Sequence, residues 1–391
     1  MWEKLMHPKL LDQESPLGSY FGPLKPRLSD RVMSQASFDK IKNLADTLPH
    51  DVSSFWGFEV PLHLNSDISN GDADFLFCST QSEHQARVLA GDSQSEIPAG
   101  YLEMPAWSKV QAFCKKWEDQ SHVLHKQLLN VWLEFDVASN EPPYQPSFFF
   151  GLLPPERTTP AKRRRVITTA LNELNSGVIS QGFTEALNTV MIRRDSSWIF
   201  QVGLMMSRNT EAIRVCIRDL ASTDEVMHLV HDLEWPGDLL ELRSLLTELE
   251  PMCHSIDLDI DLSTGPDGKI GPKLGIECSF GLSQAVVTYT KKFTEWLLDR
   301  GFLTEEGAAG LIAYNGLVHQ DADPSAWPDH LIKRAAITGP DVANQIACWV
   351  HHIKVVYQPS EPLSAKAYLA ALPDRTSRRV LLERIKANNL V

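Results

Sequence analysis

The spacing of apolar residues along the chain switches repeatedly between a helical and a strand period. Over residues 38–48 they recur three or four positions apart, as on one face of a helix, and Pro49 follows as a stop signal. Over residues 55–64 large apolar residues occupy alternate positions, and a second alternating run, 73–80, follows the turn-forming segment NSDISNGD. The pattern predicts a helix followed by a pair of strands.

This order of helix and strand pair occurs four more times. The further predicted strand pairs are 131–137 with 147–153, 198–206 with 211–220, 255–263 with 273–281, and 348–358 with 363–372. The further predicted helices are 106–117, 161–174, 223–234, 238–249, 284–300, 304–316, 327–337 and 376–387. We therefore expect an irregular segment over residues 1–37, followed by a single domain over 38–391.

Side chains alternate between the two faces of a strand, and each predicted strand has one apolar and one charged face. The segment SIDLDIDLS, residues 255–263, shows this most clearly, because isoleucine and leucine alternate there with three aspartates. The apolar faces need cover, which the helices can provide. The charged faces together carry Glu59, Glu134, Asp136, Arg214, Arg218, Asp257, Asp259, Asp261, Glu277, His352, Lys354, Lys366 and Tyr368.

Two arrangements of the ten strands agree with this pattern. In an open sheet the charged face would look into water, and its residues would be ordinary solvated side chains. In a closed barrel the same face would line a lumen wide enough for a ligand. Ten strands strain an open twisted sheet, and closure removes both edges. We therefore predict an α+β fold, a ten-stranded antiparallel β-barrel of five α-β-β-α units inside a ring of helices.

Composition narrows the range of partners. The chain has 391 residues and a formal net charge of −13, whereas a nucleic-acid surface needs clustered lysine and arginine. One basic run, residues 162–165, opens a predicted amphipathic helix and is expected to be solvated. We expect no nucleic-acid partner.

The cysteines and the N-terminus bear on the compartment. The six cysteines are scattered, without a C-x-x-C pair or a zinc-like spacing, and several lie in apolar strand patterns. The N-terminus lacks a charged-then-apolar signal, and no segment approaches the roughly 18 apolar residues of a membrane span. These features predict buried, reduced thiols in a cytoplasmic protein that has no membrane partner.

Five α-β-β-α units that close ten antiparallel strands inside a ring of helices resemble the ABBA, or PT-barrel, prenyltransferases. The resemblance covers the order of elements over residues 38–387. Members of that family often carry a K-x-Y strand motif, and this sequence has Lys366-Ala367-Tyr368 in SAKAYLA. The resemblance implies a transferase that moves an isoprenoid group from an allylic diphosphate to an aromatic or nitrogenous small molecule or peptide in the barrel. It implies no required cofactor.

The resemblance also implies roles for residues on the charged face. Diphosphate-binding side chains would be Arg214, Arg218, Lys354, Lys366 and Tyr368. Glu59 or Glu134 would remove the acceptor proton, as a glutamate does in the indole-type enzymes. The residues assigned to substrate binding are Trp132, Asp136, Asp257, Asp259, Asp261 and Glu277. Tyr357 lies three residues after Lys354 and is expected on the opposite face.

The acidic strand face allows another hypothesis. Residues 257–262 do not form a calcium loop, because that motif needs glycine where Leu262 stands, and there is no DDxxD magnesium motif. Three aspartates beside Glu277 could still hold Mg²⁺ or a cationic substrate. The alternative function is a non-catalytic binding or accessory protein with a cationic peptide or metabolite in an acidic lumen. Convergence of Arg214, Arg218, Lys354 and Lys366 on one point would favour the transferase.

Other motifs add little. The sequence has no G-x-S-x-G, P-loop, G-x-G-x-x-G or H-E-x-x-H motif. His351 and His352 are adjacent on a predicted strand, so we expect them on opposite faces and unable to share a metal ion. We therefore assign no metal ligands.

Overall fold

The computed structural model describes residues 16–380, apart from 29, 54, 63–71, 82–83, 94–95, 176–178, 193–197, 209, 211, 221 and 282–284. Its ten principal strands are β1 Phe55–Leu62, β2 Asp74–Ser79, β3 Leu128–Phe135, β4 Ser147–Leu152, β5 Trp198–Leu204, β6 Ile213–Leu220, β7 Ser255–Leu262, β8 Ile270–Ser279, β10 Val342–Tyr357 and β11 Ser364–Ser377. Each predicted strand pair is present.

The strands close into a barrel in which every neighbouring pair is antiparallel. Strands β1 to β8 pair in sequence order, β8 then pairs with β10, and β10 pairs with β11. The ring closes where β11 also pairs with β1, with Ala371 opposite Trp56 and Ala367 opposite Val60. The predicted closed ten-stranded barrel is confirmed, and the open sheet with a solvated charged face is excluded.

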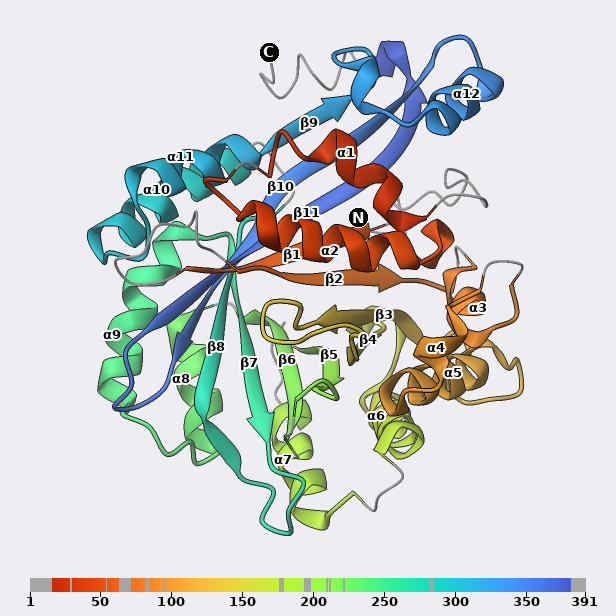
Figure 1. The fold of residues 1–391 in the computed structure, drawn as a ribbon. Helices are drawn as coiled ribbons and strands as arrows, with labels where there is room; N and C mark the ends of the chain where they lie inside the picture. The colour runs from red at the N-terminus through yellow and green to blue at the C-terminus, as the bar shows by residue number, and fades with distance from the viewer. Residues whose placement is uncertain are drawn as a thin grey trace.

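The helices lie outside the barrel, as Figure 1 shows. They are α1 Phe21–Leu24, α2 Gln35–Thr47, α3 Gln85–Ala90, α4 Ala99–Leu102, α5 Pro105–Glu118, α6 Pro160–Asn175, α7 Gln181–Ile192, α8 Thr223–Asp232, α9 Leu239–Leu249, α10 Ala285–Asp299, α11 Glu305–Tyr314 and α12 Asp329–Thr338. The apolar strand faces point outward against them. Phe58 and Phe75, for example, are fully buried against Phe21 of α1. The charged strand faces are consequently turned into the barrel.

Several elements differ from the prediction. A short strand, β9 Gly316–His319, pairs with the N-terminal part of β10 outside the ring of ten. Strands β10 and β11 extend further than predicted, to Val342 and Ser377, through segments rich in alanine and polar residues that give little apolar alternation. Residues 376 and 377 therefore belong to a strand and not to the helix predicted over 376–387, most of which lies outside the described residues.

The N-terminal segment contains more structure than expected. A 3-10 helix, Leu17–Tyr20, leads into α1 within residues 1–37, for which we expected no regular element. Tyr20 packs against Trp56 at a ring distance of 5.6 Å, and Arg27 Nη1 donates a hydrogen bond to the carbonyl of Ala313. This segment is therefore part of the helical cover of the barrel.

The state of the cysteines agrees with the prediction from the sequence. All six cysteines are buried, and none of them forms a disulfide, as expected. No helix among the described residues has both the length and the apolar character that crossing a bilayer requires.

Candidate functional site

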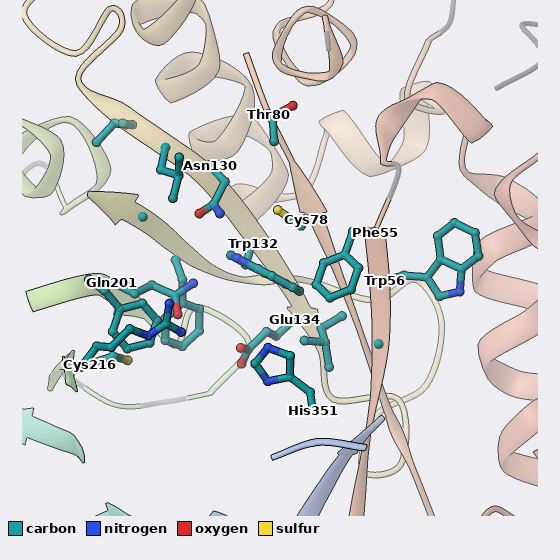
Figure 2. A pocket seen from close by; sticks show the side chains of 18 of the residues that line it. Phe55, Trp56, Cys78, Thr80, Asn130, Trp132, Glu134, Gln201, Cys216 and His351 are labelled. Atoms are coloured by element: carbon teal, nitrogen blue, oxygen red, sulfur yellow. The ribbon is translucent and has the colours of Figure 1, made fainter. Parts of the chain in front are cut away.

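A cavity of about 690 Å³ lies inside the barrel. One end is lined by residues of the loops and short helices that follow the strands, including Gln81, His84, Arg87, Lys126 and Arg157. His84, Arg87, Lys126 and Arg157 are exposed, so this end is the mouth of the cavity. Figure 2 looks into the cavity, towards which residues from several different strands point.

Aromatic side chains line the cavity below the mouth. Strands β1, β3, β4 and β5 contribute Phe55, Trp132, Phe149 and Phe200. Phe55 and Trp132 meet edge to face with ring centroids 5.3 Å apart, and Trp349 stacks on Phe55 at 5.7 Å. Such a wall excludes water and offers faces on which a planar ring or an isoprenoid chain can pack. Trp132 was predicted here from strand alternation.

The predicted diphosphate-binding residues are divided between the cavity and the layer beneath it. Arg214 and Arg218 from β6, Lys354 from β10 and Tyr368 from β11 line the cavity. Lys366 does not line the cavity. It precedes Tyr368 by two positions on β11 and lies further from the mouth. Three of the four predicted cations therefore share one cavity.

Each of these cations pairs with a carboxylate. Arg214 forms two hydrogen bonds of 2.9 Å to Asp261, and Arg218 Nε lies 3.2 Å from an oxygen of Asp257. Strand register explains the first pair, because Arg214 stands directly opposite Asp261 on β7. The acidic strand that the sequence showed therefore supplies counter-ions to the neighbouring strand.

Lys354 of β10 lies between two carboxylates, Asp259 of β7 and Glu277 of β8. Its Nζ donates to Asp259 and lies 3.4 Å from Glu277 Oε1, and its side chain is only 8% exposed. Burial lowers the pKa of Lys354, but the charges of Asp259 and Glu277 outweigh burial, so the pKa lies above its ordinary value. Lys354 is therefore charged at neutral pH.

A second group of ion pairs lies deeper in the barrel. Glu59 accepts hydrogen bonds from Lys366 and from the Tyr368 hydroxyl. Asp136 accepts a 2.9 Å hydrogen bond from Nε of Arg208, a residue of the turn between β5 and β6, and another from Ser207. Arg208 could not be identified from the sequence, because a turn carries no strand alternation to indicate the direction of its side chains. None of Glu59, Asp136 or Lys366 lines the cavity.

Glu134 differs from the other predicted inward carboxylates. Glu59, Asp136, Asp257, Asp259, Asp261 and Glu277 each have a cationic partner within 4 Å. Within the described part of the chain Glu134 has no such partner and no hydrogen bond, although it lines the cavity. Burial, followed by the negative charge of Glu59, raises the pKa of Glu134 to about 8.

The pKa of Glu59, the other predicted catalytic glutamate, is lowered instead of raised. Burial raises the pKa of Glu59, but the charge of Lys366 and the hydrogen bonds from Lys366 and Tyr368 outweigh it, so the pKa falls to about 2. Glu59 is therefore a fully ionised member of a buried network. Of the two glutamates, Glu134 is the one that reaches the cavity and titrates near neutral pH.

Arg218 keeps part of its hydrogen-bonding capacity. Its guanidinium carbon lies 4.0 Å from the centre of the Phe200 ring, and its Nη groups have no partner among the described residues. Burial raises the pKa of Asp257 to about 7 in spite of the Arg218 charge. Burial favours the neutral form of Asp257, so this carboxyl neutralises Arg218 less completely than an ordinary carboxylate would.

The expected placement of the two histidines is wrong. Strand β10 changes register between Val350 and His352, and this bulge turns both His351 and His352 into the cavity. Their Nδ1 atoms are 2.8 Å apart, and His352 stacks on Tyr368 at 4.1 Å. Burial lowers the pKa of both rings, that of His352 to about 3, so both are neutral at pH 7. Strand alternation cannot foresee a bulge.

The placement of Tyr357 agrees with the prediction from strand alternation. Tyr357 does lie on the outer face, where its hydroxyl donates a 2.7 Å hydrogen bond to Glu241 of α9. No group of three histidine, cysteine or acidic side chains among the described residues is arranged to hold a metal ion. Strand alternation groups Phe200 with Val202 on the apolar outer face, but a register shift between Ile199 and Gln201 turns Phe200 into the cavity.

Comparison with known proteins gives a match in structure alone. No protein-family model and no curated protein matches the sequence. The prenyltransferase PriB in its apo form has a TM-score of 0.53 and 11% sequence identity, over 91% of this chain and 96% of that chain. The ternary complex of PriB with L-tryptophan and dimethylallyl thiolodiphosphate also has a TM-score of 0.53, at 10% identity and the same coverage.

A 5-dimethylallyl tryptophan synthase from Streptomyces coelicolor, in complex with DMASPP and Trp, has a TM-score of 0.48 and 13% identity, over 91% of this chain and 95% of that chain. The similarity to PriB extends over nearly the whole of both chains, and it agrees with the closed ring of ten antiparallel strands described above. The chain therefore has the fold of the ABBA, or PT-barrel, aromatic prenyltransferases.

Proposed function

We propose that this protein transfers an isoprenoid group from an allylic diphosphate to an aromatic or nitrogenous acceptor, a small molecule or a peptide, inside the barrel. The observation that carries the proposal is that Arg214, Arg218 and Lys354 line one cavity together with a wall of aromatic side chains. Departure of a diphosphate needs fixed cations, and the resulting allylic cation needs protection from water. The solved structures of PriB with the same fold, including a product diphosphate complex, support the proposal.

The cavity suggests where each substrate binds. Arg214, Arg218 and Lys354 belong to β6 and β10, on the side of the ring that runs from β6 through β7 and β8 to β10. Trp132 and Phe149 belong to β3 and β4 on the other side. The donor diphosphate would bind along the first side, nearest to Arg218, and the acceptor would pack on the second.

The reaction would follow from this arrangement. The C–O bond of the allylic diphosphate breaks, and its electron pair leaves with the diphosphate under the charge of the three cations. The acceptor supplies the electron pair of the new C–C or C–N bond and loses one proton. Glu134, in its ionised form, is the carboxylate best suited to receive that proton, because it lines the cavity and its raised pKa of about 8 makes it a stronger base than an ordinary carboxylate.

Calorimetric titration with dimethylallyl, geranyl and farnesyl thiolodiphosphates tests the donor site. We expect at least one of them to bind, and Arg218→Gln to weaken its binding about tenfold, the usual loss for one charge-assisted contact of about 1.4 kcal/mol. Lys40→Met, which removes an exposed lysine outside the barrel, is the control and should bind like wild type. Failure of all three analogues to bind would reject the prenyltransferase assignment.

The same titrations with and without Mg²⁺ test the need for a cofactor. The Arg218 Nη groups remain able to donate to diphosphate oxygens beside Arg214 and Lys354, so we propose that Mg²⁺ changes the affinity less than threefold, about 0.6 kcal/mol. A donor that binds in the presence of Mg²⁺ and fails to bind in EDTA would contradict this part of the proposal and would indicate a metal bridge to the acidic residues.

A further inference from the structure

The inference concerns the chemical class of the acceptor, and it rests on the proposed function. Glu134 lies on β3, next but one to Trp132 on the same strand face, on the side of the cavity assigned to the acceptor. In the ring of ten strands β3 and β8 are five positions apart, so Glu134 and Glu277 lie on opposite walls. A ligand between these walls meets carboxylates from two directions.

The charged groups around Glu134 do not neutralise it. Those that act on it are Glu59 of β1, Lys354 of β10, Arg214 of β6 and Arg208 of the β5–β6 turn, and Glu134 in turn acts on Tyr368 of β11. His351 of β10, labelled in Figure 2, lines the same cavity. The three cations are paired with Asp259 and Glu277, with Asp261 and with Asp136, respectively. Glu134 is therefore without a counter-charge of its own in this part of the cavity whenever it is ionised.

Two buried polar atoms of the cavity wall point to the same conclusion. Asp259 is 4% exposed, and within the described part of the chain its Oδ1 has no hydrogen-bond partner other than the weakly donating thiol of Cys216 beside it. His352 is 9% exposed, and no described residue lies within hydrogen-bond distance of its Nε2, since Glu277 Oε1 is 3.6 Å away. Buried polar atoms are rarely left unpaired in a native protein, so an occupant with several N–H donors would complete this wall.

We infer that the acceptor carries a positively charged nitrogen, an alkylammonium or a guanidinium group, that binds to the Glu134 carboxylate between the aromatic wall and Glu277. Trp132 and Phe149 add faces suited to a cation, because the π-electrons of an aromatic ring attract positive charge. A neutral indole or phenol offers Glu134 no counter-charge and would leave it mostly protonated.

A matched pair of probes tests the inference. Tryptamine carries an ammonium group where its isostere tryptophol carries a hydroxyl. At pH 7 most Glu134 side chains are protonated, so binding of the ammonium group should displace about one proton, which titration in buffers of different ionisation enthalpy detects. We expect tryptamine to bind wild type at least tenfold more tightly than tryptophol, with dimethylallyl thiolodiphosphate present.

Two variants test whether Glu134 causes the preference for tryptamine and the proton release. Glu134→Gln keeps the shape of the side chain and should abolish both the proton release and the preference for tryptamine, while its affinity for the thiolodiphosphate stays within threefold of wild type. Glu141→Gln removes a carboxylate that is 85% exposed in the loop of the same hairpin and should behave like wild type. Donor binding is measured on the same samples, so failure of the proposed function is seen separately as loss of donor binding.

Three outcomes would overturn the inference while leaving the transferase intact. They are equal affinity for the two probes, binding of tryptamine without proton release, and absence of tryptamine binding to a protein that binds the donor analogue. A preference for tryptamine that persists in Glu134→Gln would also overturn it, because the charge would then be recognised elsewhere.

Discussion

At the scale of single residues, Glu134 makes stability depend on pH in a characteristic way. Its pKa is about 8 in the folded protein and near 4.5 when exposed. Between these values the folded state binds a proton that the unfolded state has lost, so this residue makes the free energy of unfolding fall as pH rises. Glu134→Gln should remove most of this fall, on the order of 3 kcal/mol between pH 5 and pH 9. Urea unfolding at both pH values measures it, and an unchanged slope in the variant would show that Glu134 ionises normally.

Variants of Lys366 distinguish a structural role of this residue from a role in donor binding. Lys366→Met leaves Glu59 buried and without its cation, which should destabilise the fold by about 3 kcal/mol. The double variant Glu59→Gln/Lys366→Met removes both charges and should recover most of that loss. Because Lys366 does not line the cavity, both variants should retain donor affinity within threefold at temperatures where they are folded. A tenfold loss of donor affinity in the double variant would return Lys366 to the diphosphate site.

At the scale of elements, strands β10 and β11 present two tyrosines to opposite sides of the barrel wall. Tyr357 bonds outward to Glu241 of α9, so Tyr357→Phe should cost about 1 kcal/mol of stability and leave catalysis unchanged. Tyr368 lines the cavity and donates to Glu59, so Tyr368→Phe should lower turnover as well as stability. Unfolding and turnover measured on both variants decide the matter, and equal effects on turnover would contradict the assigned faces.

Alternation within strands explains how much of the fold the sequence predicts. A barrel strand covered by helices has one apolar face, and the alternating residues of SIDLDIDLS show that face in the sequence. Strand pairs and their inward residues could therefore be identified. Pairing partners could not, because the contact between Arg214 and Asp261 depends on register across two strands. The bulge at His351 and the turn residue Arg208 were missed for related reasons, since neither follows the two-residue period.

At the scale of the whole molecule, the charge inside the barrel sets its preference for anions or cations. Protonation of Asp257, with a pKa of about 7, and of Glu134, with a pKa of about 8, removes negative charge from the barrel interior. Binding of an isoprenoid thiolodiphosphate alone should therefore weaken as pH rises from 7 to 9, by roughly tenfold for 1.4 kcal/mol of added repulsion. The double variant Glu134→Gln/Asp257→Asn should show a flat profile in the same titrations. Stronger donor binding at pH 9 in wild type would contradict this electrostatic account.

The central claim is that the barrel cavity binds an isoprenoid diphosphate at its cationic wall. The most direct test is a crystal structure of the protein with the thiolodiphosphate that binds most tightly in solution. We predict diphosphate density in contact with Arg218, within reach of Arg214 and Lys354, and an isoprenoid chain against Phe200. Density at the exposed cations of the mouth, or an empty cavity in crystals soaked at saturating concentration, would contradict the claim.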